Sequence, residues 1–124
     1  MAGRRAAIKW LLNKTSLNSR GIAYFADDDN TYDLRLFHEL LAISYGKVGM
    51  WPVGLISPFG VSGPVVDKKS GKVVAFISDV ASRKFPVDMA GFAVHLSLLH
   101  VKKPEMPYRA TWEEEGFLTG LDLR

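Results

Sequence analysis

The sequence predicts a mixed α/β fold in one small domain, and three patterns support this. Residues 21–26 form a continuous apolar and aromatic run bounded by a glycine and by acids, as in a buried strand. From Thr31 onward, apolar residues recur at helical spacing. Residues 65–66 and 72–77 are apolar runs on either side of Asp67-Lys68-Lys69-Ser70-Gly71, which favours a β-hairpin.

The other elements follow in chain order. Residues 4–12 have apolar side chains at helical spacing, so a helix is expected there, followed by a polar turn. The helix from Thr31 should pack one apolar face, with Asn30 or Thr31 as its cap. That face consists of Leu34, Phe37, Leu40 and Leu41.

Downstream, residues 47–55 read as a strand in which Pro52 implies an edge or a bulge. The remaining expectations are a loop over 56–64, a polar connection over 78–84, an extended segment over 85–87, a helix over 90–100, a basic loop over 101–109 and a last helix over 111–121. No repeat or domain boundary interrupts the 124 residues, so we expect a single domain, 1–124.

Composition excludes several classes of protein. The formal charge of +3 is spread along the chain, which argues against nucleic acid as a partner. There is no cysteine, and hence neither a disulfide nor a thiolate zinc site. No apolar run approaches the roughly 18–20 residues of a membrane span.

Asn13-Lys14-Thr15 is an N-glycosylation acceptor triplet, which matters only in the secretory pathway.

Three consecutive carboxylates, Asp27, Asp28 and Asp29, follow the predicted strand and precede the predicted helix. Carboxylates at such a position suit Mg²⁺ or Mn²⁺, which bind one or two acids and complete their shell with substrate phosphates. The plainer interpretation is that acids before a helix stabilise its N-terminus. Three adjacent acids exceed what one cap can use, so we expect them to converge on one cleft.

Three sequence blocks, in order, carry a family resemblance. They are Tyr24-Phe25-Ala26-Asp27-Asp28-Asp29-Asn30-Thr31-Tyr32, Trp51-Pro52-Val53-Gly54-Leu55 and Phe85-Pro86-Val87-Asp88-Met89-Ala90-Gly91-Phe92-Ala93-Val94. Together they resemble the animal β-1,3-glucuronosyltransferases, over nearly the whole chain from Arg4 onward. The resemblance implies part of a nucleotide-diphospho-sugar transferase fold of the GT-A type, with a mixed sheet and flanking helices.

The resemblance also implies roles for the residues on the side of the sugar donor. Asp29 corresponds to the ligand of a Mn²⁺ ion beneath the diphosphate of UDP-glucuronic acid, and Asp27 and Asp28 to residues on the ribose side. Counting back from Trp10 places a donor-side arginine on Arg4. Without the resemblance, Arg4 reads equally well as a solvated surface charge.

On the sugar and acceptor side, the resemblance assigns Arg83 and Asp88 to the sugar site. Without it, Asp88 reads as a helix cap. The catalytic base, which takes the proton of the acceptor hydroxyl, falls on Glu114 when Phe117-Leu118 is aligned with the family's apolar pair. Glu113 and Glu115 flank it, and a run of glutamates alone reads as an acidic first turn of a helix.

Two positions depart from the family pattern. Ser62 replaces a glutamate before Gly63-Pro64, and Asp79 replaces a tryptophan whose face would suit a galactose ring. The identity of the acceptor is therefore open. The segments that would seat the uracil and supply a diphosphate-binding histidine have no counterpart here, so we expect a chain cut short at both ends.

The leading hypothesis is an inverting transferase that moves glucuronic acid from UDP-glucuronate to the 3-hydroxyl of a terminal galactose, in proteoglycan-linker or related glycan synthesis. By resemblance it would lie at the lumenal side of the Golgi membrane. Two alternatives stay open: a non-catalytic remnant that keeps only a metal- and diphosphate-binding turn, and a metal-dependent phosphohydrolase. The oligomeric state is also open, a homodimer among the options.

Overall fold

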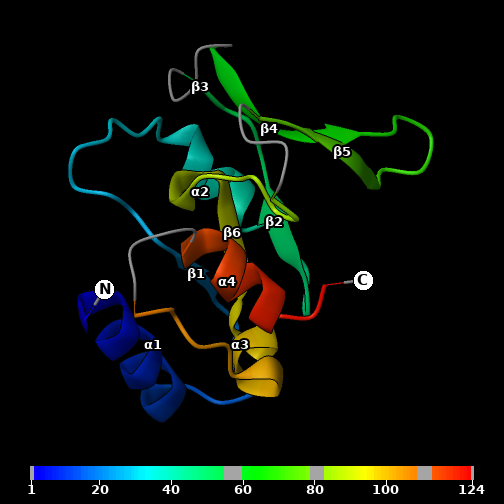
Figure 1. Ribbon diagram of the computed structural model, residues 1–124. Coiled ribbons are helices and arrows are strands. Elements are labelled where there is room, and N and C mark those ends of the chain that lie inside the picture. The colour runs from blue at the N-terminus through cyan, green and yellow to red at the C-terminus, as the bar shows by residue number, and fades with distance from the viewer. Residues whose placement is uncertain (1, 55–59, 79–82, 109–112, 124) are drawn as a thin grey trace.

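The structure, a computed structural model, describes residues 2–54, 60–78, 83–108 and 113–123, and mixed helix and sheet is confirmed (Figure 1). The elements are α1 (Ala2–Lys14), β1 (Ile22–Tyr24), α2 (Arg35–Leu40), β2 (Val48–Met50), β3 (Val53–Gly54), β4 (Val61–Val66), β5 (Val73–Ile77), the 3₁₀ helix η1 (Met89–Gly91), β6 (Phe92–His95), α3 (Leu96–Lys102) and α4 (Glu113–Gly120). Among the helices in these ranges, none has the length and apolar character needed to cross a membrane.

The strands within the described ranges form two three-stranded sheets. The central sheet has the order β1-β6-β2, and the hairpin sheet has the order β3-β4-β5. Every pairing between the described strands is antiparallel; Ala23 lies opposite Val94, and Gly49 opposite Ala93. The acids after β1 therefore follow an outer strand of an antiparallel sheet.

The middle strand, β6, lies where we expected a helix over residues 90–100, and that prediction is wrong. The segment divides into η1, β6 and α3, with Phe92, Ala93 and Val94 fully buried. An apolar run buried on both faces has no period of its own, so the sequence pattern does not separate strand from helix. His95 ends the strand and caps α3, because its Nδ1 accepts a hydrogen bond from the backbone N–H of Ser97 at 3.2 Å.

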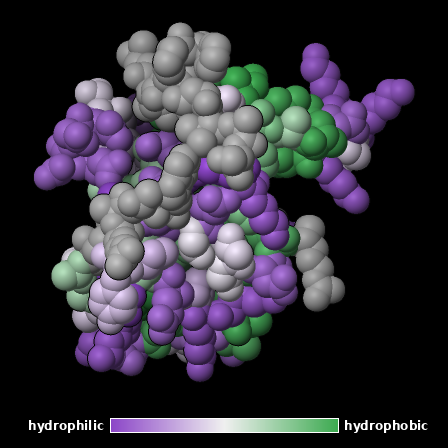
Figure 2. All heavy atoms as spheres, viewed as in Figure 1, coloured by the Kyte–Doolittle hydropathy of each residue, from purple (hydrophilic) through white to green (hydrophobic). Residues whose placement is uncertain are grey.

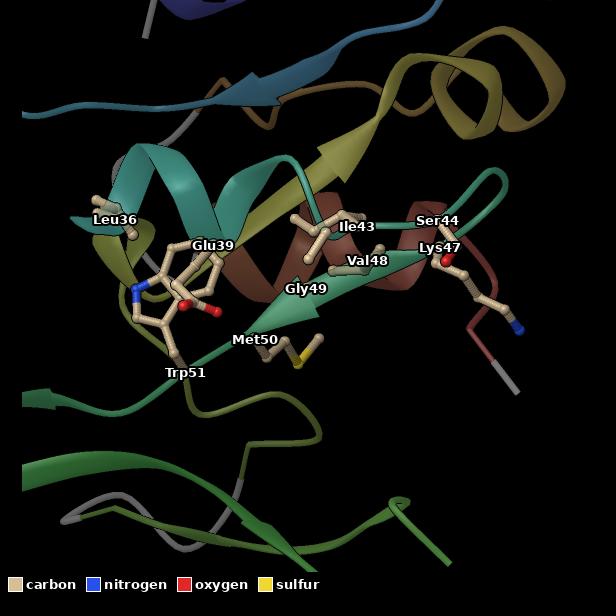
Figure 3. A pocket seen from close by; sticks show the side chains of 10 residues that line it. Leu36, Glu39, Ile43, Ser44, Lys47, Val48, Gly49, Met50 and Trp51 are labelled. Atoms are coloured by element: carbon tan, nitrogen blue, oxygen red, sulfur yellow. The ribbon is translucent and has the colours of Figure 1, made fainter. Parts of the chain in front are cut away.

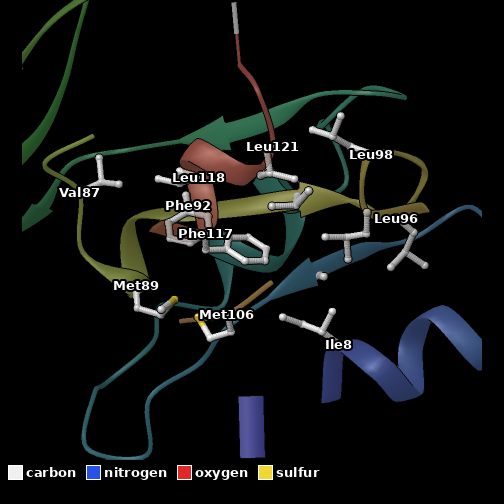
Figure 4. Packing of buried hydrophobic residues seen from close by; sticks show 13 residues of the cluster. Ile8, Val87, Met89, Phe92, Leu96, Leu98, Met106, Phe117, Leu118 and Leu121 are labelled. Carbon is white, nitrogen blue, oxygen red and sulfur yellow. The ribbon is translucent and has the colours of Figure 1, made fainter. Parts of the chain in front are cut away.

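The hydrophobic core lies between the central sheet and helices α1, α3 and α4 (Figure 4). Phe117 of α4 stacks on Phe92 with ring centroids 6.0 Å apart and meets Phe25 edge-on at 5.4 Å. Leu118 of α4 and Leu121, directly after the helix, extend this buried face. Burying each such side chain stabilises the fold by about 1.5–3 kcal/mol, so α4 is held firmly against β6.

Helix α2 is shorter and more exposed than expected. It begins at Arg35 instead of Thr31, because the Asp33 carboxylate accepts a hydrogen bond from the Arg35 N–H at 2.9 Å. Asn30 and Thr31 therefore do not cap it. Of the predicted apolar face only one member is buried: Leu40 is covered, whereas Leu34, Phe37 and Leu41 are 82%, 52% and 79% exposed.

The predicted strand over residues 47–55 divides at Pro52 into β2 and β3, which belong to different sheets. The predicted loop over 56–64 contains the start of β4, and the hairpin that follows is confirmed. Gly63 permits this packing, because a Cβ there would lie 2.5 Å from the Pro52 Cα. Valines and lysines of the hairpin are exposed, forming the apolar arm with a polar tip in Figure 2.

Candidate functional site

The first part of the candidate site is the acid turn, residues 27–29, which follows β1. Asp27 faces inward, and its carboxylate accepts a hydrogen bond from Arg4 Nη2 at 2.6 Å. The Tyr32 hydroxyl donates to the Asp27 carbonyl at 2.6 Å, and the Tyr32 ring meets Tyr24 edge-on. The inner end of the turn is thus fixed by contacts from both sides.

The other two carboxylates of the turn differ from the expectation that all three converge. Asp28 and Asp29 are exposed, and neither carboxylate makes a hydrogen bond or ion pair with any described residue. The reason is local: the helix does not start directly after the turn but at Arg35, so the turn is not drawn in at the helix N-terminus. Asp29 is therefore an available oxygen ligand at the surface.

The second part is the glutamate turn, Glu113, Glu114 and Glu115, which opens α4. Glu113 is only 9% exposed and accepts a hydrogen bond from Arg4 Nη1. Arg4, predicted to face the sugar donor, therefore bridges the acid turn and the glutamate turn. A planar guanidinium with several donors suits this double contact.

Glu114, the predicted base, lies beside Arg83, with Arg83 Nη2 and Glu114 Oε2 3.3 Å apart. Glu115 accepts a hydrogen bond from the Lys84 N–H, and its carboxylate lies 3.9 Å from Arg83 Nε. Two adjacent glutamates thus hold the segment that begins at Arg83 against α4.

Burial raises the pKa of Glu114 above its usual value. The Arg83 cation lowers this pKa, whereas the negative charges of Glu113 and Asp88 raise it further. Desolvation disfavours a carboxylate's charged form, and this is how enzymes move a glutamate toward neutral pH for proton transfer. Glu114 thus has the electrostatic environment expected for a general base.

Asp88, the N-cap residue directly before η1, joins this group. Its carboxylate accepts a hydrogen bond from the Ala90 N–H at 2.9 Å, so the capping interpretation is confirmed. The Tyr24 hydroxyl donates to the Ala90 carbonyl at 3.2 Å. Burial, then the nearby Tyr32, Asp27 and Asp88, raise the pKa of Tyr24 to about 12. Tyr24 therefore stays neutral between the acid turn and η1.

The residues present fit a divalent cation only with help from a substrate. Within residues 2–54, 60–78, 83–108 and 113–123, no group of three or more His, Asp or Glu side chains is arranged to hold a metal ion. Asp29 offers a single exposed carboxylate with no competing partner among them. One protein carboxylate is enough for Mg²⁺ or Mn²⁺ when water and substrate phosphates supply the other ligands.

A cavity with a volume of about 570 Å³ lies elsewhere, between α2 and β2 (Figure 3). Trp51, Met50 and Ile43 line it together with Glu39. It contains no predicted site residue, although the Trp51 ring also lies 5.8 Å from that of Tyr24.

Of the two positions that depart from the family pattern, the structure describes only Ser62. Ser62 is buried on β4, and its hydroxyl donates to the Ile77 carbonyl at 3.1 Å. It therefore serves the packing of the hairpin sheet. Asp79 lies outside the described residues.

Comparison with known proteins agrees with the resemblance. The sequence profile of glycosyltransferase family 43 matches residues 1–123. The chain belongs to this family. Among curated relatives it is similar to galactosylgalactosylxylosylprotein 3-beta-glucuronosyltransferase S of Drosophila melanogaster, with 52% identity over 126 residues that cover 100% of this chain and 29% of the relative.

Two further curated relatives show the same pattern. Galactosylgalactosylxylosylprotein 3-beta-glucuronosyltransferase P of Drosophila melanogaster is 47% identical over 105 residues, which cover 83% of this chain and 21% of the relative. Galactosylgalactosylxylosylprotein 3-beta-glucuronosyltransferase 3 of Homo sapiens is 42% identical over 112 residues, which cover 90% of this chain and 32% of the relative. The chain thus spans about a third or less of these relatives' length.

Sequence reasoning missed Glu113 and Tyr32 as parts of the site. Glu113 looked like one of three equivalent glutamates, because only the fold places Arg4 against it. Tyr32 did carry a signal, since it ends the first family block, but its contact with the Asp27 carbonyl depends on how the turn folds back.

Proposed function

We propose that this chain is a catalytic segment of an inverting glucuronosyltransferase. It would move glucuronic acid from UDP-glucuronate to the 3-hydroxyl of a terminal galactose, in proteoglycan-linker or related glycan synthesis. The observation that supports this best is the placement of Glu114. This carboxylate has a raised pKa and lies beside Arg83 in a chain that family 43 matches almost end to end.

On the side of the sugar donor, Asp29 would hold Mn²⁺, and Asp27 and Asp28 would lie toward the ribose. A bound metal would neutralise the diphosphate as negative charge builds on the leaving group. The support for this role of Asp29 is that its carboxylate is exposed and unpaired among the described residues.

On the acceptor side, Glu114 would take the proton. The acceptor oxygen forms a bond to the sugar's C1 as the bond from C1 to the UDP oxygen breaks, and the hydroxyl proton moves to the Glu114 carboxylate. Attack opposite the leaving group inverts the configuration. Arg83 and Asp88 would face the sugar, consistent with their closeness to Glu114.

Arg4 could bind the sugar donor only while it also contacts Asp27 and Glu113. In the structure it already bridges Asp27 and Glu113, so a diphosphate at Arg4 would compete with two carboxylates. We propose that Arg4 contributes to the sugar donor mainly by holding Asp27.

The proposal includes a GT-A type of fold and a place at the lumenal side of the Golgi membrane. Both rest on membership of family 43. One further feature fits a lumenal protein: Asn13, the acceptor of the glycosylation triplet, is exposed in the last turn of α1.

A transfer assay tests the proposal. The chain is incubated with UDP-glucuronate, Mn²⁺ and a galactose-terminated acceptor, and both UDP and the glucuronylated product are quantified. Equal amounts of UDP and product, both dependent on the acceptor, are expected. Phosphate or UDP release without the acceptor would favour a hydrolase, and no release with measurable Mn²⁺ binding would favour a non-catalytic remnant.

A further inference from the structure

We infer that Glu113 is a positioning residue for the proposed base. By holding Arg4, which also holds Asp27, it fixes the first turn of α4 against the acid turn and so determines where Glu114 lies. The inference rests on the proposed function in treating Glu114 as the base. The geometry of the bridge itself does not depend on that role.

The bridge joins three segments that are far apart in the sequence. Arg4 uses two different nitrogens, Nη1 toward Glu113 and Nη2 toward Asp27, so that α1 is tied at once to the loop after β1 and to α4. Because the guanidinium is planar and its donors are fixed, it orients both carboxylates as well as attracting them.

The burial of Glu113 makes this contact a structural requirement. Its Oε2 is buried and has no hydrogen-bond partner among the described residues. A buried carboxylate is costly unless a cation compensates its charge. Arg4 supplies that cation, so the position of Glu113 depends on Arg4.

Helix α4 is held against the rest of the protein at two points on either side of Glu114. One turn after Glu113, Phe117 fixes the middle of α4, because it is fully buried in the core. The near end is fixed by Glu113, the first residue of the helix. Glu114 follows directly, so its direction is set between these two points.

Positioning and simple electrostatics predict opposite results for removal of Arg4. The charged groups that act on Glu114 are Arg83, Glu113 and Asp88, and burial is the largest cause of its raised pKa. Loss of the Arg4 cation alone would leave Glu113 uncompensated and raise the pKa of Glu114 further. Loss of the anchor would let water reach Glu114 and lower that pKa.

The experiment is an NMR titration of the chain with ¹³C-labelled glutamate carboxyl groups. In Arg4→Gln, positioning predicts a downward shift of the Glu114 pKa relative to the unsubstituted chain; an unchanged or raised pKa would overturn the inference. Glu105→Gln is the matched control. The exposed Glu105 also pairs with an arginine of α1, with its Oε2 4.0 Å from Nη2 of Arg5, but it does not contact Glu113 or Glu114. This substitution should leave the Glu114 titration unchanged.

A second pair of variants decides the question if Arg4→Gln does not fold. Glu113→Gln and Glu113→Ala both remove one negative charge near Glu114, but only the alanine also removes the oxygen that accepts from Arg4. Positioning predicts a lower Glu114 pKa in the alanine variant than in the glutamine variant, and equal values would overturn it. The readout needs no transfer activity, so a failed transfer assay leaves this test intact.

Discussion

The acid turn and the glutamate turn are both contacted by Arg4, yet they are built differently. At the tip of the acid turn, Asp28 and Asp29 are exposed and make no contact with the described residues. In the glutamate turn, Glu113 and Glu114 are largely buried and paired with Arg4 and Arg83.

This difference indicates how each side becomes ordered. The glutamate turn is organised by the fold itself, because cations and the core hold it before any ligand arrives. The tip of the acid turn lacks such contacts, so a metal and a diphosphate would have to order it. Substitutions in the glutamate turn should therefore affect stability and chemistry together, whereas substitutions at the tip should affect ligand binding alone.

The largest expected effect follows from Glu114→Gln. The amide keeps the shape of the side chain but cannot take the acceptor's proton, so transfer should fall by about 10²- to 10⁴-fold. UDP affinity should barely change, because the base acts on the acceptor. Transfer rates and calorimetric UDP affinity are measured side by side.

Glu115→Gln is the control for that substitution, because it keeps the acceptor of the Lys84 N–H bond and lies one residue away. If Glu115→Gln loses transfer while Glu114→Gln keeps it, the base has been assigned one position too early.

The next effect is expected at the metal. Asp29→Asn should weaken Mn²⁺ and UDP binding together by more than about 10-fold, since even residues that only support a metal ligand contribute roughly 10- to 100-fold. The melting temperature without ligands should stay the same, because the Asp29 carboxylate has no partner among the described residues. Calorimetry and thermal unfolding measure the two. If Asp28→Asn weakened Mn²⁺ and UDP binding equally, the assignment of Asp29 as the sole metal ligand of the turn would be wrong.

A smaller effect is expected on stability, where the Arg4–Glu113 ion pair can be compared with the Arg5–Glu105 ion pair. Glu113→Ala removes the partly buried Arg4 pair and should lower the free energy of unfolding by about 1–3 kcal/mol. Glu105→Ala removes the exposed Arg5 pair and should cost at most about 1 kcal/mol. Urea unfolding of both variants measures the difference. Similar losses would mean that the bridge is no more than a surface ion pair.

The smallest effect is a pH dependence of stability. Since the folded-state pKa of Glu114 lies above its ordinary value of 4.5, Glu114 favours folding in its protonated form, and this contribution disappears as pH rises through the folded-state pKa. Glu114→Gln should therefore gain stability relative to the unsubstituted chain between acidic and neutral pH. Urea unfolding at several pH values measures this gap, and a gap that narrows with rising pH would contradict it.

The sequence predicted the elements with a clear local pattern. The helix of α1, the strand β1, the hairpin turn and the last helix all appear close to the expected residues. It failed at β6, where uniform burial removes the periodicity, and at the apolar face of α2, where helical spacing was present but nothing among the described residues covers Leu34 or Leu41.

For the candidate site, the family resemblance identified Arg4, Asp27 and Glu114, which the fold brings into one neighbourhood. It did not indicate that Arg4 would be held by two carboxylates, because this depends on tertiary contacts between residues 23 and 109 positions apart. Convergence of all three aspartates was expected because they lie between an apolar strand and an amphipathic helix, but only Asp27 is partly buried, whereas Asp28 and Asp29 are exposed.

The central claim is that the two turns form one site, with a metal on the exposed side and the base on the ordered side. Paramagnetic broadening of the chain's backbone NMR signals by Mn²⁺, with and without UDP, tests it most directly. Mn²⁺ alone should weakly broaden residues near Asp29; with UDP, broadening there should strengthen and extend to η1 and the first turn of α4. Broadening centred on another part of the chain, or none at the acid turn with UDP present, would contradict the claim.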